Sequence, residues 1–131
     1  MRAFVDTNVL VRHLTGDPPD QAAAAGRFLA EADQLLLADL VLAEVAYLLE
    51  SYYEAPRPEV ALALRAILGF QTIAVIDRDL LHRAVEVYEN DRLDFAEAYL
   101  VAAAERSGVR AIASFDRSID RVGTVRRVDP S

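Results

Sequence analysis

Short apolar runs alternate with longer amphipathic runs along the chain, and this alternation restricts the fold more than any other feature of the sequence. The short runs are typical of strands and cover residues 3–5, 35–38, 72–76, 110–115 and 124–128. The longer runs have apolar residues at helical spacing and cover residues 20–32, 40–53, 59–70, 79–91 and 94–108. We also expect a helix or turn at residues 7–14 and a loop or turn at residues 116–123. Strands that alternate with helices form parallel β-α units, so the sequence predicts an α/β sandwich.

The length of the chain fits one domain. A chain of 131 residues can bury roughly two-thirds of the surface that its unfolded form exposes. Hydrophobic residues make up 53% of the sequence, which is enough for a core without disulfide bonds. No internal repeat, low-complexity linker or change of composition divides the chain. We therefore expect a single domain over residues 1–131.

The composition excludes several kinds of site. The chain has no cysteine, so it has neither disulfide bonds, nor thiolate zinc sites, nor a cysteine nucleophile. His13 and His82 are the only histidines, which leaves little for a histidine-built metal site or a Ser-His-Asp triad. The net charge is −7, and all 14 basic residues are arginines. Because an acidic protein does not attract nucleic acid through its overall field, a polyanionic ligand would need a metal ion or a local arginine cluster.

Two further features bear on location. No stretch reaches the ~18 unbroken apolar residues of a membrane span. The first apolar stretch contains Asp6, which does not suit a signal peptide. We expect a cytoplasmic protein that has no membrane partner.

Four acidic residues follow predicted strands or lie near the starts of predicted helices. Asp6 and Asp116 come directly after strands, while Glu44 and Asp94 lie close to helix starts. In open parallel sheets, ligands bind at the carboxyl ends of the strands. A topology that brings these ends together would gather the four acids around one point.

Four carboxylates cannot share a dry pocket without compensation, because like charges repel and raise one another's pKa. A hard divalent cation such as Mg²⁺ or Mn²⁺ resolves the conflict, since it prefers oxygen ligands. Such an ion also binds a phosphodiester and activates a bound water, so an all-carboxylate site indicates phosphoryl chemistry. Thr7, Asn8 and Ser114 are candidates to orient the carboxylates through hydrogen bonds.

Helix capping is the structural alternative for these acids. Asp6 and the two residues after it are all types that cap helices. Asp94 with Glu97 three residues later fits a capping box. We assign the other acids at segment ends, Asp77, Asp79 and Asp120, to turns and caps.

Glu44 lies in the most apolar helical run, on a stripe with Val41, Val45 and Leu48. A carboxylate on a buried stripe costs several kcal/mol unless it is paired or bound to a metal. We therefore expect Glu44 to be buried and to belong to the site.

Four segments occur in order over essentially the whole chain: FVDTNVLV, LVLAEVAYLL, DFAEAYLVAAAERSG, and ASFDRSIDRV with VRRVDP after it. Together they resemble the PIN-domain family, and more narrowly the VapC-type toxins of bacterial toxin–antitoxin systems. The resemblance implies a three-layer α/β/α sandwich with a central, mainly parallel sheet. It also implies a metal-dependent endoribonuclease that cuts single-stranded or looped RNA and is blocked by a cognate antitoxin. A homodimer, with a larger toxin–antitoxin assembly as a further option, follows from the same resemblance.

Asp6, Glu44, Asp94 and Asp116 match the acidic positions of the family. The resemblance implies that Asp6, Asp94 and Asp116 bind Mg²⁺ or Mn²⁺, and that Glu44 binds a second ion or orients the attacking water. Cleavage would leave 5′-phosphate and 3′-hydroxyl ends. Glu97 stands where many relatives have aspartate, and we assign it a supporting role.

Three alternatives compete with this interpretation. A phospho-accepting receiver module could use Asp77, but it needs a lysine that the chain lacks. Haloacid-type phosphatases need that lysine too, together with paired aspartates at the first strand. A PIN-like protein that binds without catalysis would keep the fold, although the presence of all four acids counts against it.

Some surface residues have two interpretations. Arg12, Arg117 and Arg121 lie near the predicted site segments and are candidates to contact RNA phosphate, although ordinary surface arginines are commoner. The tyrosines of residues 47–53 give one helix a large aromatic surface, which partner contact or core packing would explain.

Overall fold

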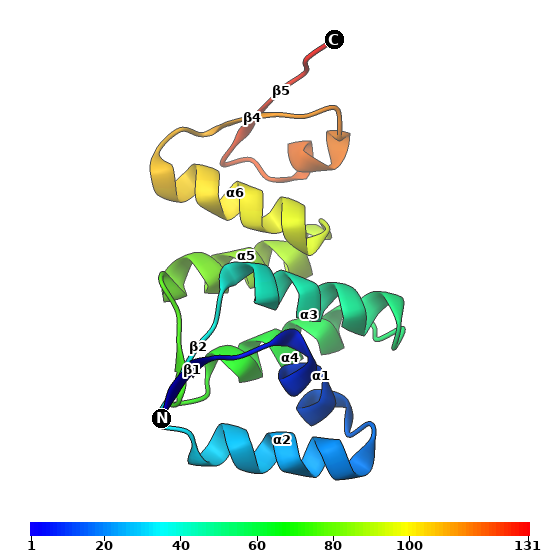
Figure 1. Ribbon diagram of the computed structural model, residues 1–131. Coiled ribbons are helices and arrows are strands. Elements are labelled where there is room, and N and C mark those ends of the chain that lie inside the picture. The colour runs from blue at the N-terminus through cyan, green and yellow to red at the C-terminus, as the bar shows by residue number, and fades with distance from the viewer. The chain divides into compact units, whose positions relative to one another are not determined.

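All five predicted strands form, and each pairing between them is parallel. The computed structural model describes residues 1–131 and contains two compact units, Met1–Ile76 and Asp77–Ser131, each with its own sheet (Figure 1). The α/β class with parallel strands is therefore confirmed. The strands are divided between a three-stranded and a two-stranded sheet.

The sheet of the first unit places Asp6 at the end of a strand. Its strands are β1 (Arg2–Phe4), β2 (Gln34–Leu36) and β3 (Ile73–Ala74), in the order β1-β2-β3. The N–H of Val5 donates to the carbonyl of Leu36 at 3.0 Å, which continues the pairing of β1 with β2 by one residue. Asp6 follows at the carboxyl end of this strand, where the sequence places it.

Four helices complete the first unit: α1 (Thr7–Thr15), α2 (Pro19–Glu31), α3 (Asp39–Ser51) and α4 (Arg57–Leu68). Helix α1 ends at Gly16, whose φ of +71° lies in the left-handed region that favours glycine. Proline in the first turn of α2 and of α4 suits a position where no backbone N–H is needed. The core of the unit contains Leu35 from the sheet with Leu42 and Leu64 from the helices, all fully buried.

The second unit contains α5 (Arg78–Asp91), α6 (Phe95–Ser107), β4 (Ala111–Ala113), a short 3₁₀ helix η1 (Arg117–Arg121) and β5 (Arg126–Val128). Strands β4 and β5 pair in parallel. Helices α5 and α6 pack against each other, with the rings of Tyr88 and Phe95 edge to face at 6.1 Å. The predicted loop or turn at residues 116–123 contains η1.

The paired strands are shorter than the apolar runs that predict them. Within residues 72–76, only Ile73 and Ala74 pair with a neighbour, and Ile76 is 94% exposed. Apolar composition favours an extended chain, but pairing also needs a neighbouring strand, and β2 offers partners only for these two residues. No helix is long and apolar enough to cross a membrane.

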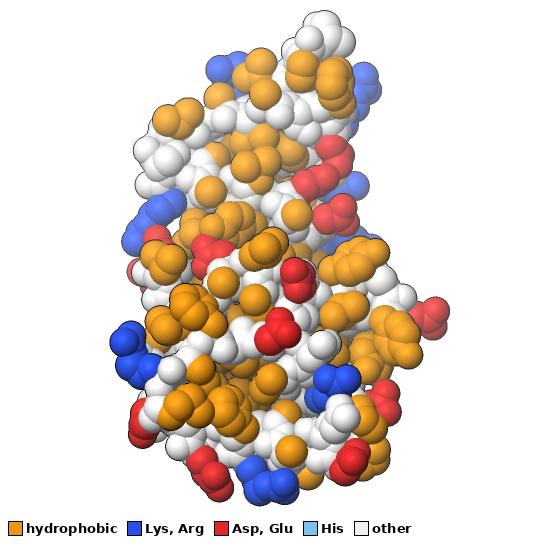
Figure 2. Space-filling model, in the orientation of Figure 1, with side chains coloured by type: hydrophobic (Ala, Val, Ile, Leu, Met, Phe, Trp, Pro, Cys, Tyr) orange, Lys and Arg blue, Asp and Glu red, His pale blue; other side chains and the backbone are white.

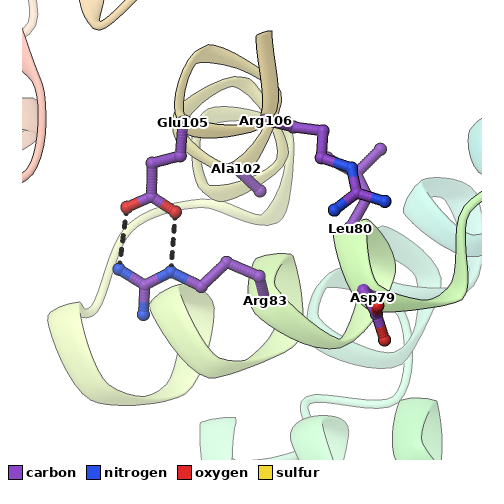
Figure 3. A pocket seen from close by; sticks show the side chains of 6 residues that line it. All are labelled: Asp79, Leu80, Arg83, Ala102, Glu105 and Arg106. Carbon is purple, nitrogen blue, oxygen red and sulfur yellow. Dashed lines mark hydrogen bonds and ion pairs between the residues drawn. The ribbon is translucent and has the colours of Figure 1, made fainter. Parts of the chain in front are cut away.

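An ion pair joins the two helices of the second unit (Figure 3). Arg83 of α5 donates from Nε to Oε1 of Glu105 at 2.8 Å, and from Nη2 to Oε2 at 2.9 Å. Both side chains line a hollow of about 370 Å³ with Asp79 and Arg106. Because Arg83 and Glu105 satisfy each other, we interpret this hollow as part of the helix packing rather than as a ligand site.

We predict that Glu105→Gln lowers the free energy of unfolding by about 1–2 kcal/mol at pH 7, because it removes a two-point contact to a charged group. The hydrogen bonds from Arg83 lower the pKa of Glu105, although partial burial acts in the opposite direction. A lowered pKa stabilises the fold above the unfolded pKa of about 4.3, and this contribution is lost as the pH falls through the folded value. Urea unfolding from pH 7 to pH 3 should show the two proteins converging.

Glu86→Gln is the matched control, because Glu86 also pairs with Arg83 but has a 54% exposed side chain. Its effect should be within about 0.5 kcal/mol. Equal effects of the two substitutions would contradict a special role for the contact between Arg83 and Glu105.

Candidate functional site

A threonine hydroxyl joins two of the predicted acids in the first unit. Thr7 is 4% exposed, and its Oγ1 donates to Oε2 of Glu44 in α3 at 2.7 Å. The N–H of Thr7 donates to Oδ1 of Asp6 at 2.8 Å. One buried residue therefore holds Asp6 through its backbone and Glu44 through its side chain.

Asp6 also occupies the N-cap position of α1. The capping interpretation and the site interpretation are compatible, because only Oδ1 accepts the capping bond and Oδ2 makes no hydrogen bond. Asp6 and Asn8 are both exposed, so both side chains are accessible from solvent.

The prediction that Glu44 is buried is wrong. The buried face of α3 consists of Leu42, Val45, Ala46 and Leu49, and Glu44 is exposed beside it. The apolar residues of this helix extend beyond the buried face, so the stripe that includes Glu44 does not face the core. Its contact with Thr7, rather than burial, fixes the position of Glu44.

In the second unit, the capping box that is the structural alternative for Asp94 and Glu97 does not form. Asp94 has the N-cap position of α6, but its side chain makes no capping hydrogen bond. Glu97 instead accepts a hydrogen bond from the hydroxyl of Ser118 at 3.0 Å. The Asp94 carboxylate is thus left available, which favours the site interpretation over the cap.

Glu97 and Asp116 form a coupled carboxyl pair. Burial, the hydrogen bond to Asp116 and the negative charges of Asp116 and Asp94 raise the pKa of Glu97. The hydrogen bond from Glu97, with those from the N–H and hydroxyl of Ser118, lowers the pKa of Asp116 to about 2. The two pKa values shift in opposite directions, as expected for carboxyl groups that interact.

Asp116 is also held by the turn that follows β4. Its N–H donates to Oγ of Ser114 at 3.0 Å, and its Oδ1 accepts from the N–H of Ser118 at 2.9 Å. The first contact is to the backbone of Asp116 rather than to its carboxylate, so the orienting role of Ser114 stays a prediction.

The site residues thus form two groups, one in each unit. Asp6, Thr7 and Glu44 lie together within Met1–Ile76, and Asp94, Glu97, Ser114 and Asp116 belong to Asp77–Ser131. The convergence of all four predicted acids on one point stays a prediction.

The donor set fits a hard divalent cation by its chemistry. All candidate ligands are carboxylate oxygens, and the negative charges of Asp116 and Asp94 contribute to the raised pKa of Glu97. A cation beside these carboxyl groups would favour their ionised forms. No group of three or more His, Cys, Asp or Glu side chains has the arrangement needed to hold a metal ion.

Comparison with known proteins decides the family. The PIN domain model matches residues 3–125. The chain belongs to the PIN-domain family. Among solved structures, it is similar to VapC20 of Mycobacterium tuberculosis, a toxin that cleaves the sarcin–ricin loop, with 23% identity over 95% of this chain and 98% of that one and a TM-score of 0.45. None of the curated proteins searched matches the chain.

Ser118 is a residue of this PIN domain that the sequence interpretation missed. It contacts both members of the carboxyl pair, through its N–H to Asp116 and its hydroxyl to Glu97. The available signal was the spacing, because an aspartate with a serine two residues later is typical of a local turn. That pattern predicts the bond to Asp116 but not the contact with α6.

The acids that the sequence assigns to caps and turns do have structural partners in this PIN domain. Asp77 is the N-cap of α5, where its Oδ1 accepts from the N–H of Leu80 at 3.1 Å, and it pairs with Arg106 at 2.9 Å. Asp120 pairs with Arg127 at 3.1 Å. The assignment of these two acids to structural roles agrees with the contacts.

We predict that Glu97→Ala raises the pKa of Asp116 from about 2 towards the ordinary value of 3.8, because the hydrogen bond from Glu97 is the largest cause of the lowered value. Carbon-13 NMR of the side-chain carboxyl groups, titrated without added metal, measures this change. Ser118→Ala should give a smaller rise, since the backbone N–H at position 118 remains. An Asp116 pKa that does not change in the Glu97→Ala protein would contradict the coupled pair.

Proposed function

We propose that this protein is a metal-dependent endoribonuclease of the VapC type. The observation that carries the proposal is the family match over residues 3–125. This range includes the four acids that the resemblance assigns to the family's acidic positions. The hydroxyl and amide contacts that hold these carboxylates without neutralising them support it. The substrate is RNA, and by the same resemblance the protein is a toxin neutralised by a cognate antitoxin.

The two units belong to one PIN domain in this proposal. The family match continues across the boundary between Ile76 and Asp77 without a break. Each unit carries only two of the four acids, and like charges gathered from both would need a cation. The catalytic site is therefore assigned to the whole chain of residues 1–131.

Asp6, Asp94 and Asp116 would hold Mg²⁺ or Mn²⁺, with Glu44 at a second ion or orienting the attacking water. The metal, when bound, lowers the pKa of a bound water and stabilises charge on the phosphodiester. Thr7 keeps Glu44 and Asp6 in fixed positions. Ser114, Ser118 and Glu97 do the same for Asp116. In-line attack on phosphorus breaks the bond to the 3′ oxygen and leaves 5′-phosphate and 3′-hydroxyl ends.

A homodimer through α3 is part of the proposal. Leu40 and Tyr47 of this helix are 71% and 66% exposed. The space-filling view has hydrophobic side chains on the surface along the course of α3 (Figure 2). Large exposed apolar side chains gathered on one helix are typical of a contact with another protein.

We predict that Asp6→Asn and Asp94→Asn each reduce RNA cleavage by about 100-fold or more, because each removes a charged ligand of the ion. Purified protein, free of antitoxin, is incubated with a mixture of structured RNAs in Mg²⁺, Mn²⁺ or EDTA. Isothermal titration with Mn²⁺ reports ion binding independently of cleavage, and both variants should bind more weakly than the wild type.

Asp20→Asn is the matched control, since Asp20 is an exposed acid in the first turn of α2. It should cut RNA at the wild-type rate. Metal binding without cleavage of any RNA would favour a PIN-like protein that binds without catalysis. Cleavage that persists in EDTA would contradict the metal-dependent mechanism.

A further inference from the structure

Arg12 in α1 has a guanidinium group without a protein partner. Its Nε is buried and makes no hydrogen bond. Arg12 also forms no ion pair, although Asp17 lines one of the hollows beside it. A buried donor that lacks an acceptor is costly and rare in folded proteins, so it requires an explanation.

Two surface hollows meet at this residue, both within the first unit, and Asn8 and Arg12 line both of them. The first, of about 300 Å³, is the tyrosine hollow, whose other lining residues include Asp17, Leu48, Tyr52 and Tyr53. The second, of about 410 Å³, lies between α1 and α2 and is mostly apolar, with Val9 and Phe28 in its wall. A ligand in either hollow therefore reaches the same guanidinium.

The chemistry around Arg12 matches a nucleotide. A guanidinium is planar and donates in a fork that fits phosphate oxygens. Tyr52 and Tyr53 lie edge to face with their ring centres 4.9 Å apart, and Tyr52 is 74% exposed. Exposed aromatic rings beside a cation are the usual means of binding single-stranded nucleic acid, because bases stack on the rings.

The position along α1 connects this group to the proposed catalytic acids. Asn8 and Arg12 are four residues apart and so share a face of the helix. Arg12 follows Asp6 by six residues, which is about 9 Å along the helix axis at 1.5 Å per residue. Arg12 therefore lies less than two helical turns beyond Asp6.

We propose that Arg12 binds a backbone phosphate of the RNA substrate and that the tyrosine hollow stacks a neighbouring base. The inference rests on the proposed function, which it extends by naming a positioning residue other than the four proposed catalytic acids. Asp17 works against the phosphate, because its carboxylate lines the same hollow, 3.5 Å from the Tyr53 hydroxyl. An acidic peptide would also satisfy Arg12, but the paired rings and the closeness to Asp6 favour RNA.

The test compares Arg12→Met with Arg27→Met. Arg27 is an exposed arginine of α2 that lines neither hollow, so its substitution controls for the change in net charge. Fluorescence anisotropy with a labelled single-stranded RNA in EDTA gives Kd at several salt concentrations without cleavage. Cleavage assays in Mn²⁺ then separate KM from kcat.

Arg12→Met should weaken RNA binding about tenfold or more and lower the slope of log K against log salt by about 0.7, the value for one phosphate contact to a single strand. KM should rise more than kcat falls. The melting temperature should stay the same or rise by a few degrees, because a buried donor without a partner is removed. Arg27→Met should change none of these.

Two further variants test the rest of the hollow. Tyr52→Leu should weaken binding about fivefold or more without a change in the salt slope, because stacking releases no counterions. Asp17→Asn should tighten binding, because it removes a negative charge from beside the phosphate.

If Arg12→Met has the same salt slope and Kd as Arg27→Met, while the wild-type protein binds and cuts RNA, the inference is overturned and the proposed function stays in place. Loss of thermal stability with an unchanged slope would assign Arg12 to packing and would equally overturn it. If the wild-type protein binds a poly-glutamate peptide more tightly than RNA, and Arg12→Met abolishes that binding, the inference is overturned and the hollow is reassigned to a protein partner. Wild-type protein that neither binds nor cuts any RNA would reject the proposed function itself.

Discussion

Repulsion between neighbouring carboxylates is the constraint on which the organisation of this PIN domain depends. Asp94, Glu97 and Asp116 lie near enough for the charge of one to affect the pKa of another. Hydrogen-bond donors lie beside the acids of both units. Ser118 donates to Glu97 and Asp116, and Thr7 donates to Asp6 and Glu44. Hydrogen bonds of this kind fix carboxylates in position and leave most of their charge in place. Charge that is fixed but not neutralised is what a divalent cation requires of its ligands.

The fold could be predicted from the sequence to the level of element type and strand direction. Hydrophobic periodicity is a local property that reports which face of a segment is buried, and the alternation of strands with helices restricts the strands to parallel pairing. Strand length was overpredicted because pairing depends on a neighbour. Val75 and Ile76 continue an apolar run, yet β2 offers them no partner. The division of the strands between two sheets also depends on contacts that no local pattern contains.

The contacts of the candidate site residues could be predicted only in part from the sequence. Asp94 and Glu97 have the spacing of a capping box, but that spacing cannot tell whether a more distant donor, here Ser118, binds Glu97 instead. Glu44 lies in a helix that is apolar on more than one face, so periodicity assigned it to the wrong face. The capping box that does not form and the wrong face given to Glu44 both occur where a tertiary contact competes with a local one. These two positions belong to the proposed site, where departures from local rules are expected.

An acidic protein that acts on RNA must concentrate positive charge where the strand passes, because its overall field repels the substrate. Arginine suits this task better than lysine, since a guanidinium is weakly hydrated and can be partly buried while it keeps its charge. On the proposed assignments, the N-cap of α1 is an anionic ligand for the metal, and the helix carries a cation for the phosphate about 9 Å further along. The same short helix then fixes the direction in which the strand crosses it. The buried Nε of Arg12, which has no acceptor, lowers the stability of the free protein, and on this proposal the cost is accepted because the guanidinium binds the substrate.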